Sequence, residues 1–411
     1  MPTTVTIDHL GQAGDGVCHW QGQNHYLPGV LPGEVVALDE AGRVQAVIEP
    51  SPDRQSPPCP HFGICGGCQL QHMTPAAYEA WQVQRLGQIL ERAGVKVTEM
   101  APLVTMPPHS RRRISVHVRW LKGKAIVGFK QRKSWSVVDV RACEIAHPDV
   151  VAALPGIVDL AGPLAQIPKA APTCHLTRTE TGLDVHITGV PPRYDARLRA
   201  QVTSAAVAMD LARLSVGKEI WIETRAPQVR FGDVLVTPPP GGFLQAVPEA
   251  EAAMAQAVQN AGKHAETVMD LFCGAGAFAL RLARDHAVEA YEMNAEAITA
   301  LQTAARRQQG LKPVQAKARD LFRMPLSAKE LNRAQAVVLN PPRAGAEAQV
   351  AQLAASEVQT IAYVSCNPQT FARDAKVLQQ AGYRLCRLQP IDQFLWSPHV
   401  EIVGILEKLS T

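Results

Sequence analysis

One short segment, DLFCGAG at residues 270–276, is typical of the turn between the first strand and the first helix of a cofactor-binding α/β domain. Its two glycines permit a tight turn and let a ligand approach backbone N–H groups at a helix start. The following strand ends at Glu292, where a carboxylate can accept hydrogen bonds from ribose hydroxyls. We therefore expect a cofactor that contains a ribose, in contact with Phe272, Gly274 and Ala277.

Around this turn, strands and helices alternate from about residue 240 to the C-terminus. Such alternation predicts an α/β fold in which helices cover both faces of a doubly wound, mainly parallel sheet. A dinucleotide enzyme would usually have a third glycine where this chain has Phe278, and the segment instead resembles motif I of the class I (Rossmann-like) S-adenosylmethionine methyltransferases. The predicted strands occupy residues 266–272, 288–293, 314–319, 334–340, 360–365, 382–389 and 399–408.

Two polar residues follow the next strands of this domain. Asp320 comes after the third strand and is placed to reach an adenine amino group, although it could equally be an ordinary helix N-cap. Asn340 opens the sequence NPPR. In methyltransferases of this fold, [ND]PP lies beside the donor methyl group, and the alternative role for the prolines is to end a strand.

Cys366 and Glu401 are the predicted catalytic pair. Cys366 follows the fifth strand, where a thiol beside a cofactor cleft is a candidate nucleophile, or else a buried structural cysteine. Glu401 precedes the last strand and supplies a carboxylate that could act as a general base, or that is only solvated.

The elements DLFCGAG, NPPRAG, VSCNP and HVE, in this order, resemble the RNA uracil-C5 (5-methyluridine) methyltransferases over essentially the whole chain. The segment Phe243-Leu244-Gln245 matches that family's F-x-Q element, so the resemblance implies that Gln245 contacts the cofactor. It also implies that Cys366 adds to C6 of a uridine and that Glu401 removes the proton from C5.

Three residues depart from the family pattern. Asn340 replaces the usual Asp, Ala277 stands where an Asn is frequent, and Val247 replaces another common Asn. These departures leave open an RNA-binding assembly factor with a degenerate methyltransferase fold. Asn340 also suggests an amino-group methyltransferase, but Arg343 stands where such enzymes carry a stacking aromatic residue.

The N-terminal half predicts two further domains. Within 411 residues we expect a small OB-like β-barrel at 1–52, a cysteine segment and helix at 53–99, a β-rich domain at 100–238 and the methyltransferase domain at 239–411. The first segment resembles the family's TRAM domain, which binds RNA.

Three cysteines crowd into a ten-residue stretch, which in an intracellular chain indicates a metal or cluster rather than disulfides. The best fourth ligand is Cys143. A [4Fe–4S] cluster tolerates a distant fourth cysteine better than zinc does, and the pattern resembles the iron–sulfur branch of the family, which includes bacterial 23S ribosomal RNA enzymes. Zinc, or no metal, are the alternatives. The predicted ligands are Cys59, Cys65, Cys68 and Cys143.

The net charge of +4 hides a basic segment at residues 109–135, which has nine Lys or Arg and no Asp or Glu. Interspersed aromatic side chains could stack on unpaired bases, although a solvated strand face is the plainer interpretation. RNA, most simply 23S rRNA and alternatively tRNA, is the expected partner. The predicted phosphate contacts are Arg111, Arg113, Arg132 and Lys133.

The N-terminus shows no signal peptide, and the chain contains no apolar run that could span a membrane. We expect a cytoplasmic, monomeric enzyme without membrane contacts.

Overall fold

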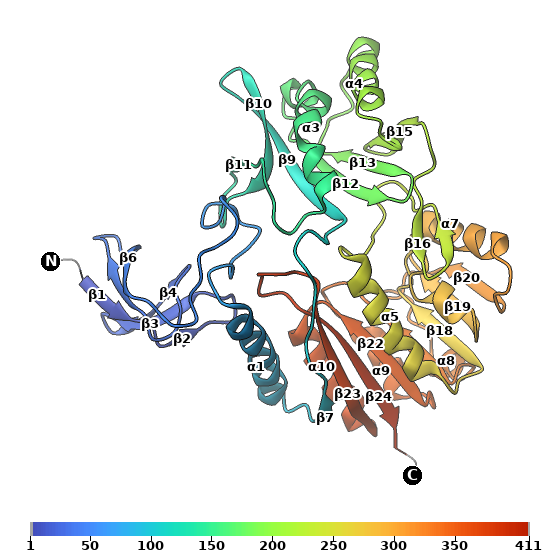
Figure 1. Cartoon of the computed structure of the whole chain (residues 1–411). Coiled ribbons are helices and arrows are strands. Elements are labelled where there is room, and N and C mark those ends of the chain that lie inside the picture. The colour runs from blue at the N-terminus through green and yellow to red at the C-terminus, as the bar shows by residue number, and fades with distance from the viewer. Residues whose placement is uncertain (1–2, 410–411) are drawn as a thin grey trace.

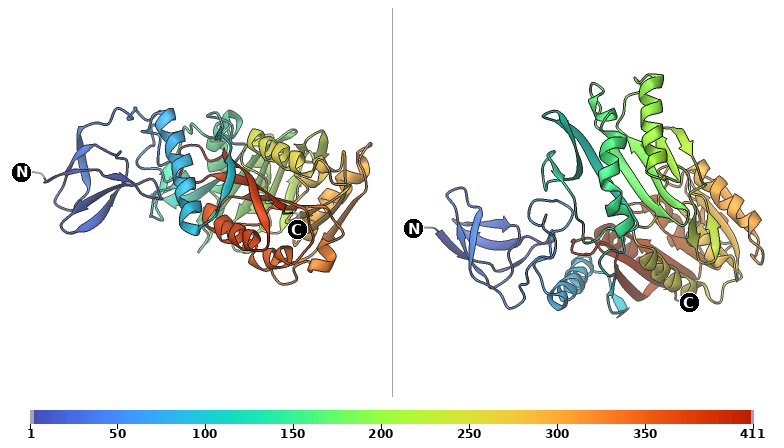
Figure 2. Two further views of the ribbon diagram at one scale, coloured as in Figure 1. Left: turned by 90° about the horizontal axis from the view of Figure 1, so that it is seen from below. Right: turned by 45° about the horizontal axis from the view of Figure 1, so that its top comes forward.

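A computed structural model describes residues 3–409. The chain forms an N-terminal β unit, a central β-rich unit and a C-terminal α/β unit (Figure 1). The N-terminal strands make a lobe that projects from one side of the molecule in every view (Figure 2). Among the described residues, no helix has the length and apolar character needed to cross a membrane.

The α/β unit is built on one large sheet with the strand order β20-β19-β18-β21-β22-β24-β23-β7. Only β24 runs antiparallel to its neighbours β22 and β23. This sheet confirms the predicted fold class. The strands are β18 (Thr267–Leu271), β19 (Ala287–Glu292), β20 (Val314–Ala318), β21 (Ala336–Leu339), β22 (Thr360–Ser365), β23 (Tyr383–Asp392) and β24 (Glu401–Lys408).

Helices cover both faces of this sheet, so its central strands are apolar on both sides. Alternate residues of β18 enter opposite cores: Val268 packs with α5, α6 and α7, whereas Met269 and Leu271 pack with α8, α9 and α10. Figure 2 shows the sheet between α5 and α10. The helices are α5 (Pro248–Gly262), α6 (Ala279–Leu282), α7 (Ala295–Arg307), α8 (Ala328–Leu331), α9 (Glu347–Ala354) and α10 (Pro368–Gln380).

A segment from the N-terminal half completes the α/β unit. Helix α1 (Pro75–Ala93) ends at Gly94, whose φ of 72° gives the expected glycine stop, and packs against α10. Strands β7 (Val97–Met100) and β8 (Val104–Thr105) then pair with the free edge of β23. The expected division at residue 99 therefore falls inside β7, a strand that belongs to the large sheet of the α/β unit. By pairing there, β7 and β8 cover the edge of β23 that would otherwise be exposed.

The N-terminal unit consists of two three-stranded sheets, β1-β5-β6 and β2-β3-β4, around one small core. Residues 3–49 of this unit form six strands. Their bounds are β1 (Thr3–Thr6), β2 (His9–Leu10), β3 (Gly16–Trp20), β4 (Gln23–Leu27), β5 (Val35–Leu38) and β6 (Val44–Glu49).

The central unit is a seven-stranded sheet in the order β11-β10-β9-β12-β13-β14-β15, followed by the hairpin β16–β17. Helices α2 (Pro148–Ala152), α3 (Leu154–Ala161) and α4 (Ala196–Ala208), with the 3-10 turn η1 (Leu164–Gln166), pack on one face (Figure 1). The strands are β9 (Arg113–Leu121), β10 (Lys124–Lys130), β11 (Val137–Asp139), β12 (Thr173–Thr179), β13 (Gly182–Thr188), β14 (Arg213–Val216), β15 (Glu219–Glu223), β16 (Val229–Phe231) and β17 (Val234–Val236).

Candidate active site

A cavity of about 390 Å³ opens at the carboxyl ends of the central strands of the α/β unit. Ligands bind at this end of open α/β sheets, because helix starts and loops converge there. The structure brings into this one cavity all the predicted cofactor and catalytic residues except Ala277 and Asp320. Those lining it are Gln245, Phe272, Gly274, Glu292, Asn340, Cys366 and Glu401.

The turn after β18 has the conformation that its glycines predict. Gly274 and Gly276 have φ values of 54° and 98°, and a Cβ at Gly276 would stand 2.5 Å from the Leu301 side chain. Glu292 lies across from this turn and accepts hydrogen bonds from the backbone N–H of Gly274 at 3.2 Å and of Asn294 at 2.9 Å. The acidic residue is thus held at the cofactor side of the cavity.

Ala277 and Asp320 stand outside the cavity lining. The carbonyl of Ala277 accepts a hydrogen bond from Arg281. Asp320 Oδ1 accepts hydrogen bonds from the backbone N–H of Phe322 at 3.0 Å and of Arg323 at 3.2 Å. Asp320 therefore caps the turn after β20, the alternative role that the sequence left open, while the Phe322 ring lines the cavity.

Sheet register brings Cys366 and Glu401 together. Ser365 at the end of β22 pairs with Ile402 of β24, so the next pair along the two strands is Cys366 and Glu401. Burial, followed by the charge of Glu401, raises the pKa of the Cys366 thiol to about 11. Burial raises the pKa of Glu401 to about 7, where a carboxyl group can both accept and return a proton near neutral pH.

Arg343 lines the same cavity, and its charge lowers the pKa of both groups against the effect of burial. Its backbone carbonyl accepts hydrogen bonds from Asn367 Nδ2 at 3.0 Å and from Thr370 Oγ1 at 3.2 Å. These bonds join the backbone of the NPPR loop to the segment that follows Cys366.

Gln393 is a site residue that the sequence did not reveal. Its Nε2 donates to Gln245 Oε1 at 2.7 Å and to Glu401 Oε1 at 2.9 Å. Its own Oε1 accepts from the backbone N–H of Ala246 at 3.1 Å and of Val247 at 3.4 Å. The side chain is buried, and it links the predicted cofactor contact to the predicted base. No local motif marks it, since Gln245 lies 148 residues away in the chain.

A buried ion network fixes Gln245 from the central unit. Arg112 Nε donates to the Gln245 carbonyl at 3.1 Å, and its Nη2 pairs with Glu251 at 2.7 Å. Glu251 also binds Arg281 at 3.0 Å. The start of β9, the F-x-Q segment and the first helix after the cofactor turn are thereby held together.

The four predicted cluster cysteines line a second cavity of about 230 Å³ at the junction of the cysteine segment and the central sheet. Burial, with smaller contributions from the other three thiols, raises the pKa of the Cys68 thiol to about 12. Within residues 3–409, however, no group of three or more His, Cys, Asp or Glu side chains could hold a metal ion. The structure therefore places four thiols around one cavity, but it does not itself show a metal site.

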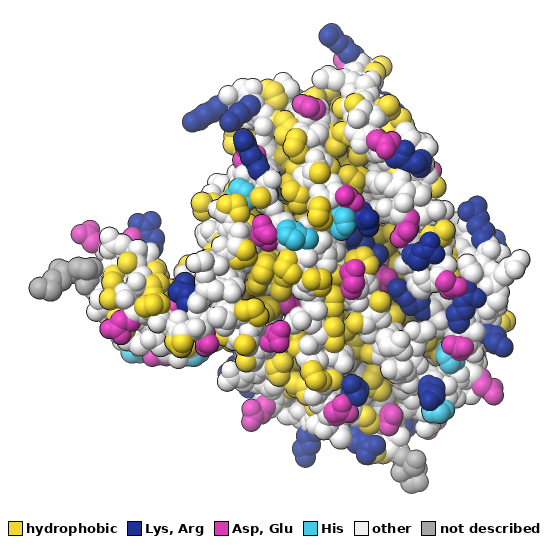
Figure 3. All heavy atoms as spheres, in the orientation of Figure 1, with side chains coloured by type: hydrophobic (Ala, Val, Ile, Leu, Met, Phe, Trp, Pro, Cys, Tyr) yellow, Lys and Arg dark blue, Asp and Glu magenta, His cyan; other side chains and the backbone are white. Residues whose placement is uncertain are grey.

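The four predicted phosphate contacts lie in different surroundings. Arg132 pairs with the buried Asp15 and so joins the N-terminal and central units. Arg111 is mostly buried over the Phe394 ring and lines the cysteine cavity, and Arg113 donates to the Gly241 carbonyl at 3.4 Å. Of the four, only Lys133 is well exposed. Figure 3 shows further Lys and Arg side chains at the tip of the β9–β10 hairpin.

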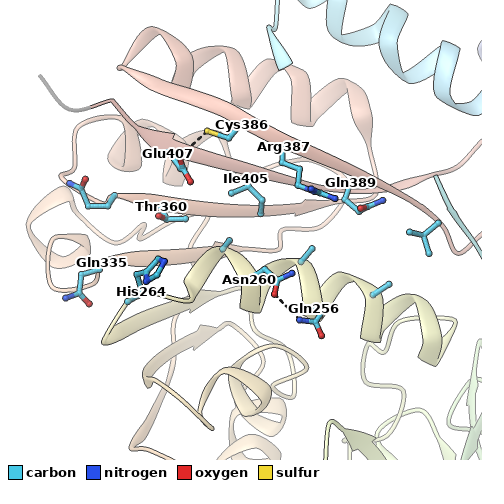
Figure 4. A pocket seen from close by; sticks show the side chains of 16 residues that line it. Gln256, Asn260, His264, Gln335, Thr360, Cys386, Arg387, Gln389, Ile405 and Glu407 are labelled. Carbon is cyan, nitrogen blue, oxygen red and sulfur yellow. Dashed lines mark hydrogen bonds between the residues drawn. The ribbon is translucent and has the colours of Figure 1, made fainter. Parts of the chain in front are cut away.

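A larger cavity, of about 840 Å³, lies between α5 and the strands β22–β24. Figure 4 shows the side chains that line it, among them Gln256, Asn260 and His264. It is away from the carboxyl ends of the parallel strands and contains none of the predicted site residues. The cavity of about 390 Å³ that contains Cys366 and Glu401 is therefore the candidate active site.

A doubly wound sheet, a glycine turn facing an acidic strand end and a thiol–carboxyl pair in the same cavity define an S-adenosylmethionine-dependent methyltransferase. The comparisons give the family. A sequence model of tRNA (uracil-5-)-methyltransferases matches residues 238–409. An uncharacterized RNA methyltransferase of Caulobacter vibrioides is 45% identical over 98% of this chain and 99% of its own.

The 23S rRNA (uracil(1939)-C(5))-methyltransferase RlmD of Pectobacterium atrosepticum is 30% identical over 98% of this chain and 93% of its own. Among solved structures, the tRNA (uracil-54, C5)-methyltransferase of Pyrococcus abyssi with S-adenosyl-L-homocysteine is similar, with a TM-score of 0.76 and 22% identity over 98% of this chain and 99% of that one. The chain belongs to the RNA uracil-5-methyltransferase family.

Proposed function

We propose that this enzyme methylates carbon 5 of a uridine in 23S rRNA, with Cys366 as the nucleophile and Glu401 as the base. The observation that carries this proposal is the convergence of Cys366, Glu401 and Arg343 in the cavity that also contains the cofactor residues. The 23S target is supported by the relative of Pectobacterium atrosepticum, which shares nearly full length with this chain.

The chemistry requires each of these groups. C5 of uridine is a weak nucleophile, and addition of the Cys366 thiolate to C6 moves an electron pair into the ring and activates C5. S-Adenosylmethionine, when bound, supplies the electrophilic methyl group that C5 attacks. Glu401 then removes the C5 proton, and the electron pair of that C–H bond re-forms the C5–C6 double bond and expels the thiolate.

The resting protonation states fit this order of events. With a pKa of about 11, the Cys366 thiol is neutral before RNA binds, and it loses its proton to solvent as it adds to the ring. Arg343 favours the thiolate. Glu401 has a pKa of about 7 and remains available as a carboxylate for the later step. The target uridine must leave its stack to reach these groups.

A 5-fluorouridine trap tests the mechanism. RNA carrying 5-fluorouridine has no C5 proton to remove, so the enzyme with S-adenosylmethionine should form a stable covalent adduct through Cys366. C366A should form no adduct, and C386S, which removes a half-buried thiol outside the catalytic cavity, should behave like the parent. Adduct formation by C366A would overturn the mechanism, and mapping of 5-methyluridine in 23S rRNA and tRNA of cells with and without the protein tests the target.

We also propose that Cys59, Cys65, Cys68 and Cys143 hold a [4Fe–4S] cluster. All four thiols line one cavity, and a [4Fe–4S] cluster is held by four cysteine thiolates. The bound cluster would supply positive iron charge to four half-buried thiolates and would join the cysteine segment to the central unit.

Metal analysis tests this second proposal. Anaerobically purified protein should contain about four iron and four sulfide per chain. C143S should lower the iron content, whereas C174S, which changes a fully buried cysteine elsewhere in the central sheet, should not. Stoichiometric zinc without sulfide would overturn the cluster.

A further inference from the structure

The central sheet has one face covered by helices and one face that is partly exposed. Ile114, Val116 and Val118 of β9 point into the core beneath α2–α4, as do Cys174 and Leu176 of β12. The alternate residues of β9, β12, β13 and β14 point the other way. On that second face, a largely buried row of Arg113, Thr177, Asp184 and Arg213 lies beside a group of imidazoles and hydroxyls that we call the histidine face: Ser115, His117, Thr173, His175, His186, Thr188 and Ser215.

One row of this face runs straight across four strands. Ser115, His175, His186 and Ser215 are direct cross-strand neighbours. Ser115 Oγ and His175 Nδ1 are 2.7 Å apart, and His186 Nδ1 and Ser215 Oγ are 2.8 Å apart. The imidazoles of His175 and His186 stack on each other, with ring centroids 5.8 Å apart and an angle of 25° between the ring planes. The two imidazoles therefore contact each other, and each also interacts with one serine hydroxyl.

A second row lies one residue pair farther along the strands. His117, Thr173 and Thr188 are cross-strand neighbours, and His117 Nδ1 lies 3.0 Å from Thr173 Oγ1. In the part of the chain that the structure describes, the Nε2 atoms of His117 and His186 have no hydrogen-bond partner. Nε2 of His117 remains for an external donor or acceptor, whereas the edge of His186 that carries Nε2 faces Gly241.

The imidazoles are neutral near pH 7. Burial and the neighbouring His186 lower the pKa of His175 to about 4, and burial also lowers the pKa of His186 and of His117. Arg119 and Lys130 stand next to His117 at one edge. Arg113, Arg213 and Asp184 stand on the other side of the pair, where Arg213 is paired with Asp184 and Arg113 donates to the Gly241 carbonyl. A neutral, stacked centre with a cationic edge suits unpaired nucleotides, whose bases can lie on the sheet while phosphates meet the edge.

The histidine face begins at the mouth of the active site. Gly241 packs on His186 so closely that a Cβ there would stand 2.5 Å from the ring, and Arg113 binds the Gly241 carbonyl. Two residues on, Phe243 is 67% exposed and lines the catalytic cavity. A strand of RNA leaving that cavity would therefore meet this face first. By contrast, residues 1–52 contain no Lys and a single Arg, Arg43, which pairs with Asp39.

We propose that the histidine face binds unpaired bases of the RNA next to the target uridine, with the His175–His186 pair as their contact surface and Nε2 of His117 reading a base edge. This inference rests on the proposed RNA substrate and adds the surface that would select the sequence around it.

The test compares the double variant H175A/H186A with the parent enzyme in binding to in vitro transcribed, unmodified 23S rRNA. Loss of one stacked base should weaken binding by about 5- to 150-fold. The slope of log K against log salt should stay unchanged, because no phosphate contact is lost. H175F/H186F, which keeps aromatic surface, should recover part of the affinity. H264A is the matched control, since His264 lies in the distant cavity shown in Figure 4.

Unfolding temperature and S-adenosylmethionine affinity of each variant should match the parent and show that the sheet is intact. Parent-like RNA affinity of H175A/H186A would overturn the proposed contact surface, and so would an equal loss in H264A. The 5-fluorouridine adduct is read in the same samples. RNA binding without any adduct in the parent would refute the proposed mechanism while the affinities still decide the role of the histidine face, and no RNA binding by the parent would refute both.

Discussion

The link from Gln393 to Glu401 predicts a specific change in pH dependence. In Q393L, Glu401 loses the amide donor at 2.9 Å that favours its charged form. A hydrogen bond to a charged group contributes about 1.5–3 kcal/mol. At 1.36 kcal/mol per pKa unit, its loss should raise the pKa of Glu401 by about 1–2 units above its value of about 7. Near pH 7, the fraction present as carboxylate should fall by about 5- to 50-fold.

Release of tritium from RNA carrying [5-³H]uridine measures the proton removal itself. With enzyme in excess over RNA, the rate is followed from pH 5.5 to 9.5 for the parent and for Q393L. Because only the carboxylate form is a base, the acid limb of the profile should move to higher pH in the variant, and the rate should recover at alkaline pH. Gln245 also loses its donor, so S-adenosylmethionine should bind more weakly in calorimetry.

Q349L is the matched control. Gln349 is equally buried and bonds Leu326 through both its amide atoms, but it is remote from the catalytic cavity. Its loss should lower the unfolding temperature without moving the acid limb. If the limb of Q393L coincides with that of the parent, or if Q349L shifts it equally, then Gln393 does not set the protonation of Glu401.

Three further outcomes follow from the site geometry. Alkylation of Cys366 by iodoacetamide in RNA-free enzyme, followed by mass spectrometry, should rise about tenfold per pH unit up to about pH 10, because its thiol has a pKa of about 11; a plateau near pH 8 would contradict this. G276A should weaken S-adenosylmethionine binding in calorimetry, because φ at this position is 98° and the new Cβ would displace the Leu301 side chain, whereas G22A has open space and should cost only the strain of its positive φ, about 1–2 kcal/mol of unfolding free energy. E251Q should lower the free energy of unfolding by about 3–5 kcal/mol in urea titrations, because two buried arginines lose their carboxylate partner; a change below 1 kcal/mol would mean that the network contributes little.

Local sequence patterns were sufficient for much of this molecule. The alternation of strands and helices after residue 240 predicted the doubly wound sheet, because both periods are written directly in the side-chain pattern. The glycines at 274 and 276 predicted the turn, since few other residues adopt its positive φ values. Family resemblance then brought Cys366 and Glu401 to attention, and sheet register made them neighbours.

Other features depend on partners that are distant in sequence. Asp320 could be assigned to adenine or to a cap from the sequence, and the structure shows that its Oδ1 caps two backbone N–H groups. Arg132 lies in a basic segment typical of an RNA contact, yet its guanidinium forms a salt bridge with Asp15 of the N-terminal unit. Charge in a sequence segment does not reveal which cations are already paired.

The sequence by itself determined the fold class and the glycine turn, because each is encoded by a short run of residues or by local periodicity, and its family resemblance proposed the reactive groups. Tertiary structure alone decided that β7 completes the methyltransferase sheet, that Gln393 joins Gln245 to Glu401 and that three histidines lie together on one sheet face. The physical reason is that hydrogen bonds and stacking act over a few ångströms in space, whatever the separation along the chain.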